Sequence, residues 1–143
     1  VIKKQLGKDV EFIKGSGAAG GLAAGLIAFT SAEIKQGFDV VKEIVDLEKW
    51  VDWADWIISG EGKIDSQTQY GKTLSGVAKT AKKHNKPLIA VAGALEDGYE
   101  VLYQHGVKSI FPIIEKPMEL NEAIKKAGIL LENTAERIFR TIK

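Results

Sequence analysis

Hydrophobic residues change their spacing along the chain, and this change predicts where helices and strands lie. Short apolar runs bounded by turn residues predict buried strands at 55–59, 88–92 and 109–114. Apolar positions three and four residues apart predict helices at 71–85, 98–105 and 120–141. Strands joined by helical crossovers must be parallel. The pattern therefore predicts an α/β fold with three layers, α/β/α, around a mainly parallel, Rossmann-like sheet.

The first fifty residues are rich in Gly and Ala and predict helices at about 19–32 and 38–48. Gly17, Gly21 and Gly25 fall on one face of the first of these helices. Such glycines allow close backbone packing against a sheet, whereas Gly15 and Gly17 could open a helix whose amides face an anion. Both interpretations can hold together. We expect a Gly/Ala-rich helical segment at 1–50 and a βαβαβα unit at 51–143.

A polar loop after the first predicted strand is the main candidate for a ligand site. We expect that strand to end at Ser59 and to break at Gly60–Gly62. Ligands of open α/β sheets bind beyond the carboxyl ends of the strands. Gly93 ends the next strand and is expected at the same edge. The candidate residues are Gly60, Glu61, Gly62, Lys63, Asp65, Ser66, Gln67, Thr68, Lys72 and Gly93.

Size and composition narrow the classes of function. A chain of 143 residues with 45% hydrophobic content can bury one core. Its net charge of +1 argues against nucleic acid or an anionic membrane as the main partner. The absence of cysteine excludes disulfides and cysteine-based metal sites, and it fits a cytoplasmic protein. The longest apolar run, 18–29, is too short to span a bilayer, and 1–12 lacks the apolar core of a secretory signal.

Part of the loop is similar in sequence to a phosphate-binding P-loop. Residues 66–73 read SQTQYGKT and match G-x-x-x-x-G-K-[ST] except at the first glycine. A P-loop follows its strand directly, whereas GEGKID intervenes here. Ser66 would also place a Cβ atom in a turn that requires Gly. We therefore expect no P-loop.

The aromatic and histidine residues have structural explanations. Trp50, Trp53 and Trp56 recur at every third position. They could form a stacking platform for a base, but a core edge or a subunit contact is the favoured interpretation. His84 and His105 are expected at helix ends on the surface. The spacing of acidic and histidine residues predicts no metal site, so any metal would arrive with a nucleotide.

Three segments resemble the type 1 glycerate kinases. GEGKIDSQT at 60–68, followed by GK and GVA, is similar to the family's GEGR-I-D-x-Q-T hallmark. GSGAAGGLAAGLIAF at 15–29 is similar to the family's Gly/Ala-rich segment, and KPMELNEAIKKAGILLENTAERI at 116–138 to its C-terminal helix. The chain starts with Val and lacks the family's initial D-S-F-K-G-S segment. The resemblance therefore implies the C-terminal part of a two-domain enzyme.

The resemblance also implies an activity and its participants. It implies ATP-dependent phosphorylation of glycerate to phosphoglycerate, with ATP and Mg²⁺ as cofactors. The missing N-terminal part of the same enzyme would be a partner that supplies half of the cleft, so the fragment alone is expected to be inactive. A homo-oligomer, the phosphorylated hydroxyl and the adenine-binding residues are left open.

Roles for single residues follow from the matched motif and the demands of phosphoryl transfer. Asp65 is expected to be the carboxylate nearest the transferred group, and Glu61 an indirect Mg²⁺ ligand or a residue that orders the loop. Gly60 and Gly62 would let the backbone approach a ligand closely. Ser66 would bind substrate or nucleotide, and Gln67 and Thr68 would hydrogen-bond glycerate. Lys63 and Lys72 would meet phosphate or carboxylate, although the family commonly has Arg in the place of Lys63.

Each role has a structural alternative. Asp65 or Ser66 could cap a helical turn, Lys72 could be solvated, and Glu96 and Asp97 could cap the next helix. The whole chain could likewise be a non-catalytic α/β module that binds an anionic metabolite or forms a subunit interface.

Overall fold

The computed structural model describes residues 1–70 and 73–142. The chain forms two compact units, Val1–Val40 and Val41–Lys143. They divide before the boundary at residue 50 that the sequence suggested. The elements in chain order are α1 Ile2–Leu6, α2 Ala18–Phe29, α3 Gly37–Ile44, α4 Leu47–Trp53, β1 Ile57–Ile64, the 3₁₀ turn η1 Thr68–Tyr70, α5 Leu74–Lys83, β2 Leu88–Leu95, α6 Val101–Gln104, β3 Val107–Pro112 and α7 Leu120–Thr141.

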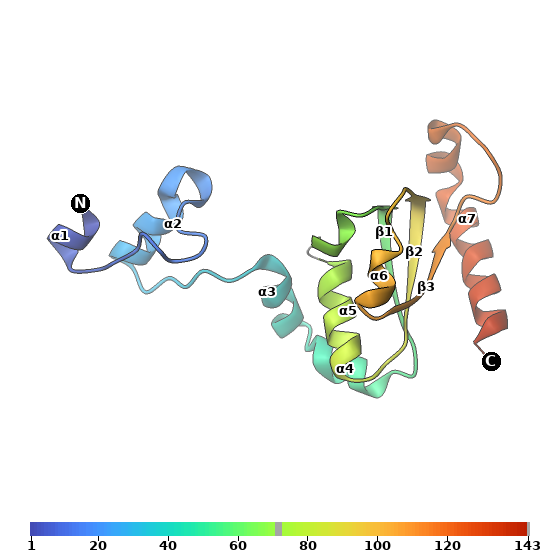
Figure 1. Ribbon diagram of the computed structural model, residues 1–143, viewed down its shortest axis with the longest axis horizontal. Helices are drawn as coiled ribbons and strands as arrows, with labels where there is room; N and C mark the ends of the chain where they lie inside the picture. The colour runs from blue at the N-terminus through green and yellow to red at the C-terminus, as the bar shows by residue number, and fades with distance from the viewer. Residues whose placement is uncertain (71–72, 143) are drawn as a thin grey trace. The chain divides into compact units, whose positions relative to one another are not determined.

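The second unit is built on a parallel sheet with the strand order β1-β2-β3. Helices α5 and α6 cover one face of the sheet, and α7 lies on the other (Figure 1). This arrangement confirms the predicted three-layer α/β/α fold. It also explains the unbroken apolar run of β2, because a central parallel strand buries side chains on both faces. Leu88, Ala90 and Ala92 join the core beneath α5, and Ile89 and Val91 join the core beside α7.

The glycines in the first two strands do not end them. We expected β1 to break at Gly60, but it continues to Ile64, and β2 continues past Gly93 to Leu95. The prediction was wrong because Gly60 still pairs through its backbone with the neighbouring strand. Gly in a strand often marks a close backbone approach. Here a Cβ atom on Gly93 would overlap the carbonyl oxygen of Gly62.

The side-chain alternation of both strands shifts at these glycines. Ala92 and Leu95 both pack into the core beneath α5, although residues three apart in a regular strand face opposite sides. The paired residue of Leu95 on β1, Ile64, is completely buried in the same core. The ends of β1 and β2 are therefore anchored together by apolar contacts just before their polar loops begin.

Other elements depart from the predicted boundaries. One helix was expected at 38–48, but Asp46 has a left-handed φ of 50° and separates α3 from α4. The helix expected at 98–105 is only Val101–Gln104, and β3 begins two residues before Ser109. Helix α7 matches its predicted range, and α5 falls within the range expected for it, although residues 71–72 lie outside the described part of the chain.

The first unit contains the Gly/Ala-rich segment. The start of α2 is irregular, because Ala19, Gly20 and Gly21 all have positive φ. The expectation that Gly17, Gly21 and Gly25 lie on one face of a helix is therefore wrong, because the backbone between Gly17 and Gly25 is not helical throughout. Lys8 ties the unit together by donating a hydrogen bond from Nζ to the carbonyl oxygen of Ala28 at 2.8 Å.

The tryptophans differ in their surroundings. Trp56 packs against the core beside α7, and the Lys108 ammonium lies 4.7 Å from the centre of its ring. This position confirms the core-edge interpretation for Trp56. Trp50 and Trp53 form an edge-to-face pair on α4 and are 55% and 78% exposed. No helix within residues 1–70 and 73–142 is long and apolar enough to cross a membrane.

A group of charged residues joins α3, α4 and α5. Glu48 Oε1 lies 2.6 Å from Lys42 Nζ, and its Oε2 lies 2.6 Å from Lys83 Nζ. His84 adds contacts to Glu48 at 3.4 Å and to Asp52 at 3.2 Å, a partner set that its sequence position did not suggest. Hydrogen bonds from Lys42, then Lys83 and His84, lower the pKa of Glu48 from 4.5 to about 2.

Replacing Glu48 with Gln is expected to remove a pH-dependent part of the stability. A carboxyl whose pKa falls on folding stabilises the protein above its unfolded pKa, and that stabilisation is lost as pH decreases from 4.5 towards about 2. The thermal midpoint of the unmodified chain should therefore fall more steeply across this interval than that of Glu48→Gln. Circular dichroism melts measure the difference, with Glu132→Gln on the exposed side of α7 as control. Parallel curves for all three proteins would contradict the expectation.

Candidate functional site

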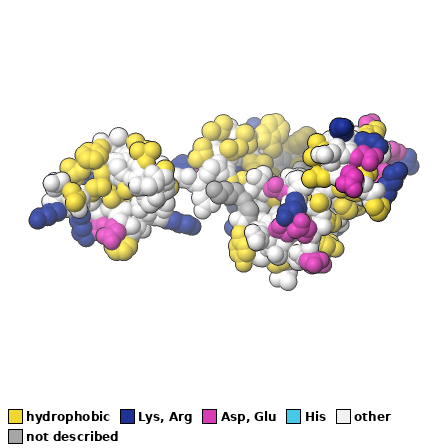
Figure 2. Space-filling model, turned by 90° about the horizontal axis from the view of Figure 1, so that it is seen from above, with side chains coloured by type: hydrophobic (Ala, Val, Ile, Leu, Met, Phe, Trp, Pro, Cys, Tyr) yellow, Lys and Arg dark blue, Asp and Glu magenta, His cyan; other side chains and the backbone are white. Residues whose placement is uncertain are grey.

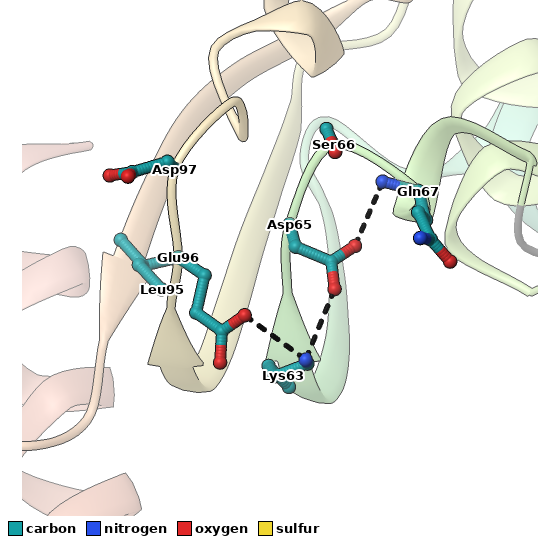
Figure 3. Close-up of a pocket in the computed structure, with 7 residues that line it drawn as sticks. All are labelled: Lys63, Asp65, Ser66, Gln67, Leu95, Glu96 and Asp97. Atoms are coloured by element: carbon teal, nitrogen blue, oxygen red, sulfur yellow. Dashed lines mark hydrogen bonds and ion pairs between the residues drawn. The ribbon is translucent and has the colours of Figure 1, made fainter.

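The carboxyl ends of β1 and β2 form the walls of a polar cavity of about 600 Å³ (Figure 3). Two segments contribute side chains, the turn after β1 and the turn after β2. Neighbouring parallel strands end at the same edge of a sheet, which brings these turns together although they are about thirty residues apart in sequence. The lining residues are Lys63, Asp65, Ser66, Gln67, Leu95, Glu96 and Asp97.

Asp65 organises the turn after β1. Its Oδ1 accepts hydrogen bonds from the backbone N–H groups of Gln67 at 2.9 Å and Thr68 at 3.2 Å. The Thr68 hydroxyl accepts a hydrogen bond from the Asp65 N–H at 3.0 Å in return. These contacts cap η1, as the structural alternative for Asp65 anticipated. They leave Asp65 Oδ2 directed towards Lys63 (Figure 3).

Lys63 lies between two carboxylates from different turns. Its Nζ is 3.2 Å from Asp65 Oδ2 and 3.1 Å from Glu96 Oε2. The hydrogen bond to Glu96, and next the one to Asp65, raise the pKa of Lys63 above its ordinary value. Lys63 in turn is the main cause that lowers the pKa of Asp65. Asp65 is therefore ionised at neutral pH, and the charges of this edge are coupled.

The turn after β2 carries functional candidates that the sequence interpretation had assigned only to capping. The Glu96 side chain points to Lys63, whereas the Asp97 carboxylate points away from it (Figure 3). The rule that selected the loop after β1 would also have selected these residues, since they follow the neighbouring strand. Gly98 holds the turn in place with a φ of 83°.

A second hollow, which we call the α7 groove, lies on the other side of the sheet edge. Its volume is about 510 Å³, and its lining is mainly apolar side chains of β2, α7 and the segment before α7. Four predicted site residues, Gly60, Glu61, Gly62 and Gly93, line this groove and do not line the cavity with Asp65. The structure thus separates Glu61 from Asp65. Thr68 hydrogen-bonds Asp65 through its hydroxyl. The predicted residues Gly15 and Gly17 belong to the first unit. Lys72 lies outside the described residues.

The charges of the polar cavity favour a cation more than an anion. Asp65, Glu96 and Asp97 supply three carboxylates against the single ammonium of Lys63. Seen from above the ends of the strands, acidic and basic side chains lie side by side on the second unit (Figure 2). Within the described residues, no group of three or more His, Cys, Asp or Glu side chains is placed to hold a metal ion by itself.

The fold and this sheet-edge cavity define a parallel α/β protein of the kind that binds small ligands beyond its strands. The chain matches the Glycerate kinase family over residues 1–143, and it belongs to that family. A glycerate kinase of Halalkalibacterium halodurans is 46% identical over 96% of this chain and 36% of its own length. A glycerate kinase of Bacillus subtilis is 43% identical over 99% of this chain and 37% of its own.

Two further relatives extend the comparison. A glycerate 2-kinase of Escherichia coli is 44% identical over 89% of this chain and 33% of its own length. A crystal structure described as that of a glycerate kinase 2 from Salmonella typhimurium LT2 superposes with a TM-score of 0.76 at 39% identity. It is matched over 99% of this chain and 36% of that one. The chain therefore spans a little over a third of the length of the relatives it matches.

Gly98→Ala is expected to destabilise the protein and to displace the turn after β2. A Cβ atom at Gly98 would lie 2.7 Å from the Cβ of Ser66, and the left-handed backbone costs a non-glycine residue about 1–3 kcal/mol. Urea denaturation monitored by circular dichroism measures the loss. Gly128→Ala in α7 is the control, because a Cβ there meets no atom within 4 Å and Ala favours a helix interior. Equal stability of the two variants would contradict this account of the turn.

Proposed function

We propose that this chain is part of a glycerate kinase that transfers phosphate from ATP to a hydroxyl of glycerate. The observation that carries the proposal is the capped Asp65 carboxylate, fixed beside a cation at the sheet edge in the motif that resembles the family's hallmark. Family membership and the names of the relatives support the reaction. The name of the Escherichia coli relative favours the 2-hydroxyl as the acceptor.

Asp65 would orient the attacking hydroxyl. Its lowered pKa keeps it ionised but makes it a weak base, so its contribution is to position the hydroxyl and to stabilise positive charge. The loose transition state of phosphoryl transfer needs little help from a strong base. Gln67 and Ser66 line the same cavity and would contact glycerate, whereas the Thr68 hydroxyl already hydrogen-bonds Asp65.

The residues fit a nucleotide-bound Mg²⁺ held partly by the protein. Mg²⁺ in such sites usually takes one or two carboxylates and completes its shell with phosphates and water. The carboxylate of Asp97 lines the cavity and would supply that share. When bound, Mg²⁺ neutralises the charge that develops on the transferred group. Glu61, which lies in the α7 groove, stays a proposed indirect ligand or loop-ordering residue.

Asp65→Asn is expected to lower kcat about 10²-fold in a protein of the relatives' full length, because the attacking hydroxyl would no longer be held in place. The Asn side-chain oxygen can still accept the two backbone hydrogen bonds that cap η1, so the turn should keep its shape. A coupled assay of ADP release measures kcat, and circular dichroism checks the fold. Asp55→Asn, an exposed change before β1, is the matched control. Near-normal turnover would remove Asp65 from the mechanism.

The alternative function is a module that binds an anionic metabolite without turnover. Titration calorimetry with glycerate and with Mg-ATP, run beside the ADP-release assay, separates the two. Heat of binding without ADP release would favour the module and overturn the kinase proposal.

The α7 groove presents apolar side chains that further polypeptide would cover. Leu120 and Ile124 are 71% and 63% exposed and Leu131 is 50% exposed, and all three line the groove. Contiguous exposed apolar surface of this kind usually marks an interaction site. Because the relatives are nearly three times as long as this chain, we assign the groove to the remaining polypeptide of a family-length enzyme.

The isolated 143-residue chain is expected to release no glycerate-dependent ADP. Most of the cleft that should enclose the transferred phosphate would be missing, so water would not be excluded from it. The same coupled assay on the isolated chain and on the family-length protein tests this. Steady transfer by the isolated chain would contradict it.

A further inference from the structure

An anionic substrate that enters the polar cavity would meet the ammonium of Lys63. Of the described residues that line the polar cavity, Lys63 alone is positively charged. Both neighbouring carboxylates already occupy its ammonium, at 3.2 Å and 3.1 Å. A carboxylate or phosphate that enters the cavity therefore meets a net negative charge, and the one ammonium, that of Lys63, is already paired with two carboxylates. The ammonium has a third N–H donor, but an anion bound there would place three negative groups around one cation. Departure of one of the two carboxylates relieves that repulsion.

The two carboxylates are held very differently. Asp65 is fixed by hydrogen bonds from the Gln67 and Thr68 backbones, and its side chain is only 22% exposed. The Glu96 side chain is 58% exposed, and Lys63 is the one partner of its carboxylate in the described part of the chain. Exposed ion pairs of this kind contribute little to stability. Glu96 is therefore the carboxylate that can leave.

We propose that Glu96 acts as a placeholder on Lys63 in the ligand-free protein. Its carboxylate occupies the position that an anionic group of the substrate takes on binding, and it swings into solvent when that group arrives. Glu96 is thus a positioning residue that sets the affinity of the site for anions. The identity of the anion, the carboxylate of glycerate or a phosphate of the donor, rests on the proposed function.

The placeholder role makes a prediction opposite to that of a binding residue. Removing the charge of Glu96 frees Lys63, so Glu96→Gln should bind the anion about two- to fivefold more tightly, the range that an exposed ion pair contributes. Asp97→Asn is the matched control. It removes the same charge from the same cavity, but its side chain points away from Lys63 (Figure 3). A general change in cavity charge would affect both variants alike.

The test uses the family-length protein and titration calorimetry with inorganic phosphate and with glycerate as separate probes. Glu96→Gln is expected to lower the Kd of at least one probe two- to fivefold, and Asp97→Asn is expected to leave it nearly unchanged. Lys63→Met should abolish the effect of Glu96→Gln in a double-mutant cycle. In the ADP-release assay, KM for the displacing substrate should fall while kcat changes less than about twofold.

Several results would overturn the proposal. These are an unchanged or raised Kd in Glu96→Gln, equal tightening in Asp97→Asn, or no binding of either probe to any of the proteins. Failure of the proposed function is a different result, namely no phosphoryl transfer to glycerate by the unmodified enzyme. The Kd for inorganic phosphate is measured without turnover. It therefore tests the role of Glu96 whether or not the unmodified enzyme transfers phosphate to glycerate.

Discussion

The pairing of β1 with β2 beyond their glycines is the contact on which the rest of the site depends. The register continues to Ile64 and Leu95, and both of these side chains enter the core beneath α5. The residues that follow, Asp65 after β1 and Glu96 after β2, then line the same cavity. Gly93 permits this because its missing side chain leaves room for the Gly62 carbonyl group. Without that close approach, the two acidic turns would not converge on Lys63.

The polar cavity and the apolar α7 groove lie on opposite sides of the sheet edge. The cavity on one side gathers charged groups, whereas the α7 groove gathers aliphatic side chains around Glu61. The carboxylate-rich cavity does not attract a polyphosphate by its own field, because like charges oppose each other. In the proposed reaction, a divalent cation that accompanies the nucleotide would resolve this conflict, and a lysine that changes partners would resolve it for a smaller anion.

The sequence predicted those features that depend on a long or local pattern. The 22 residues of α7 and the apolar run of β2 were placed well, because each repeats one signal over its whole length. The cap formed by Asp65 was also anticipated, since it acts over two or three residues. The interpretation of Gly60 as a strand breaker was wrong, because the neighbouring strand supplies the backbone partner that sequence alone does not reveal. The contact between Lys63 and Glu96 spans 33 residues and could not be derived from spacing.

The unequal exposure of the three tryptophans determines what intrinsic fluorescence can report. Trp50 and Trp53 face solvent on α4, and they should emit at long wavelength and be open to quenchers such as iodide. Trp56 packs against the core cluster that includes Ile138 of α7, so its emission should follow the docking of that helix. None of the three lines the polar cavity. A change in emission on adding a ligand would therefore report movement of the scaffold and not contact with the bound molecule.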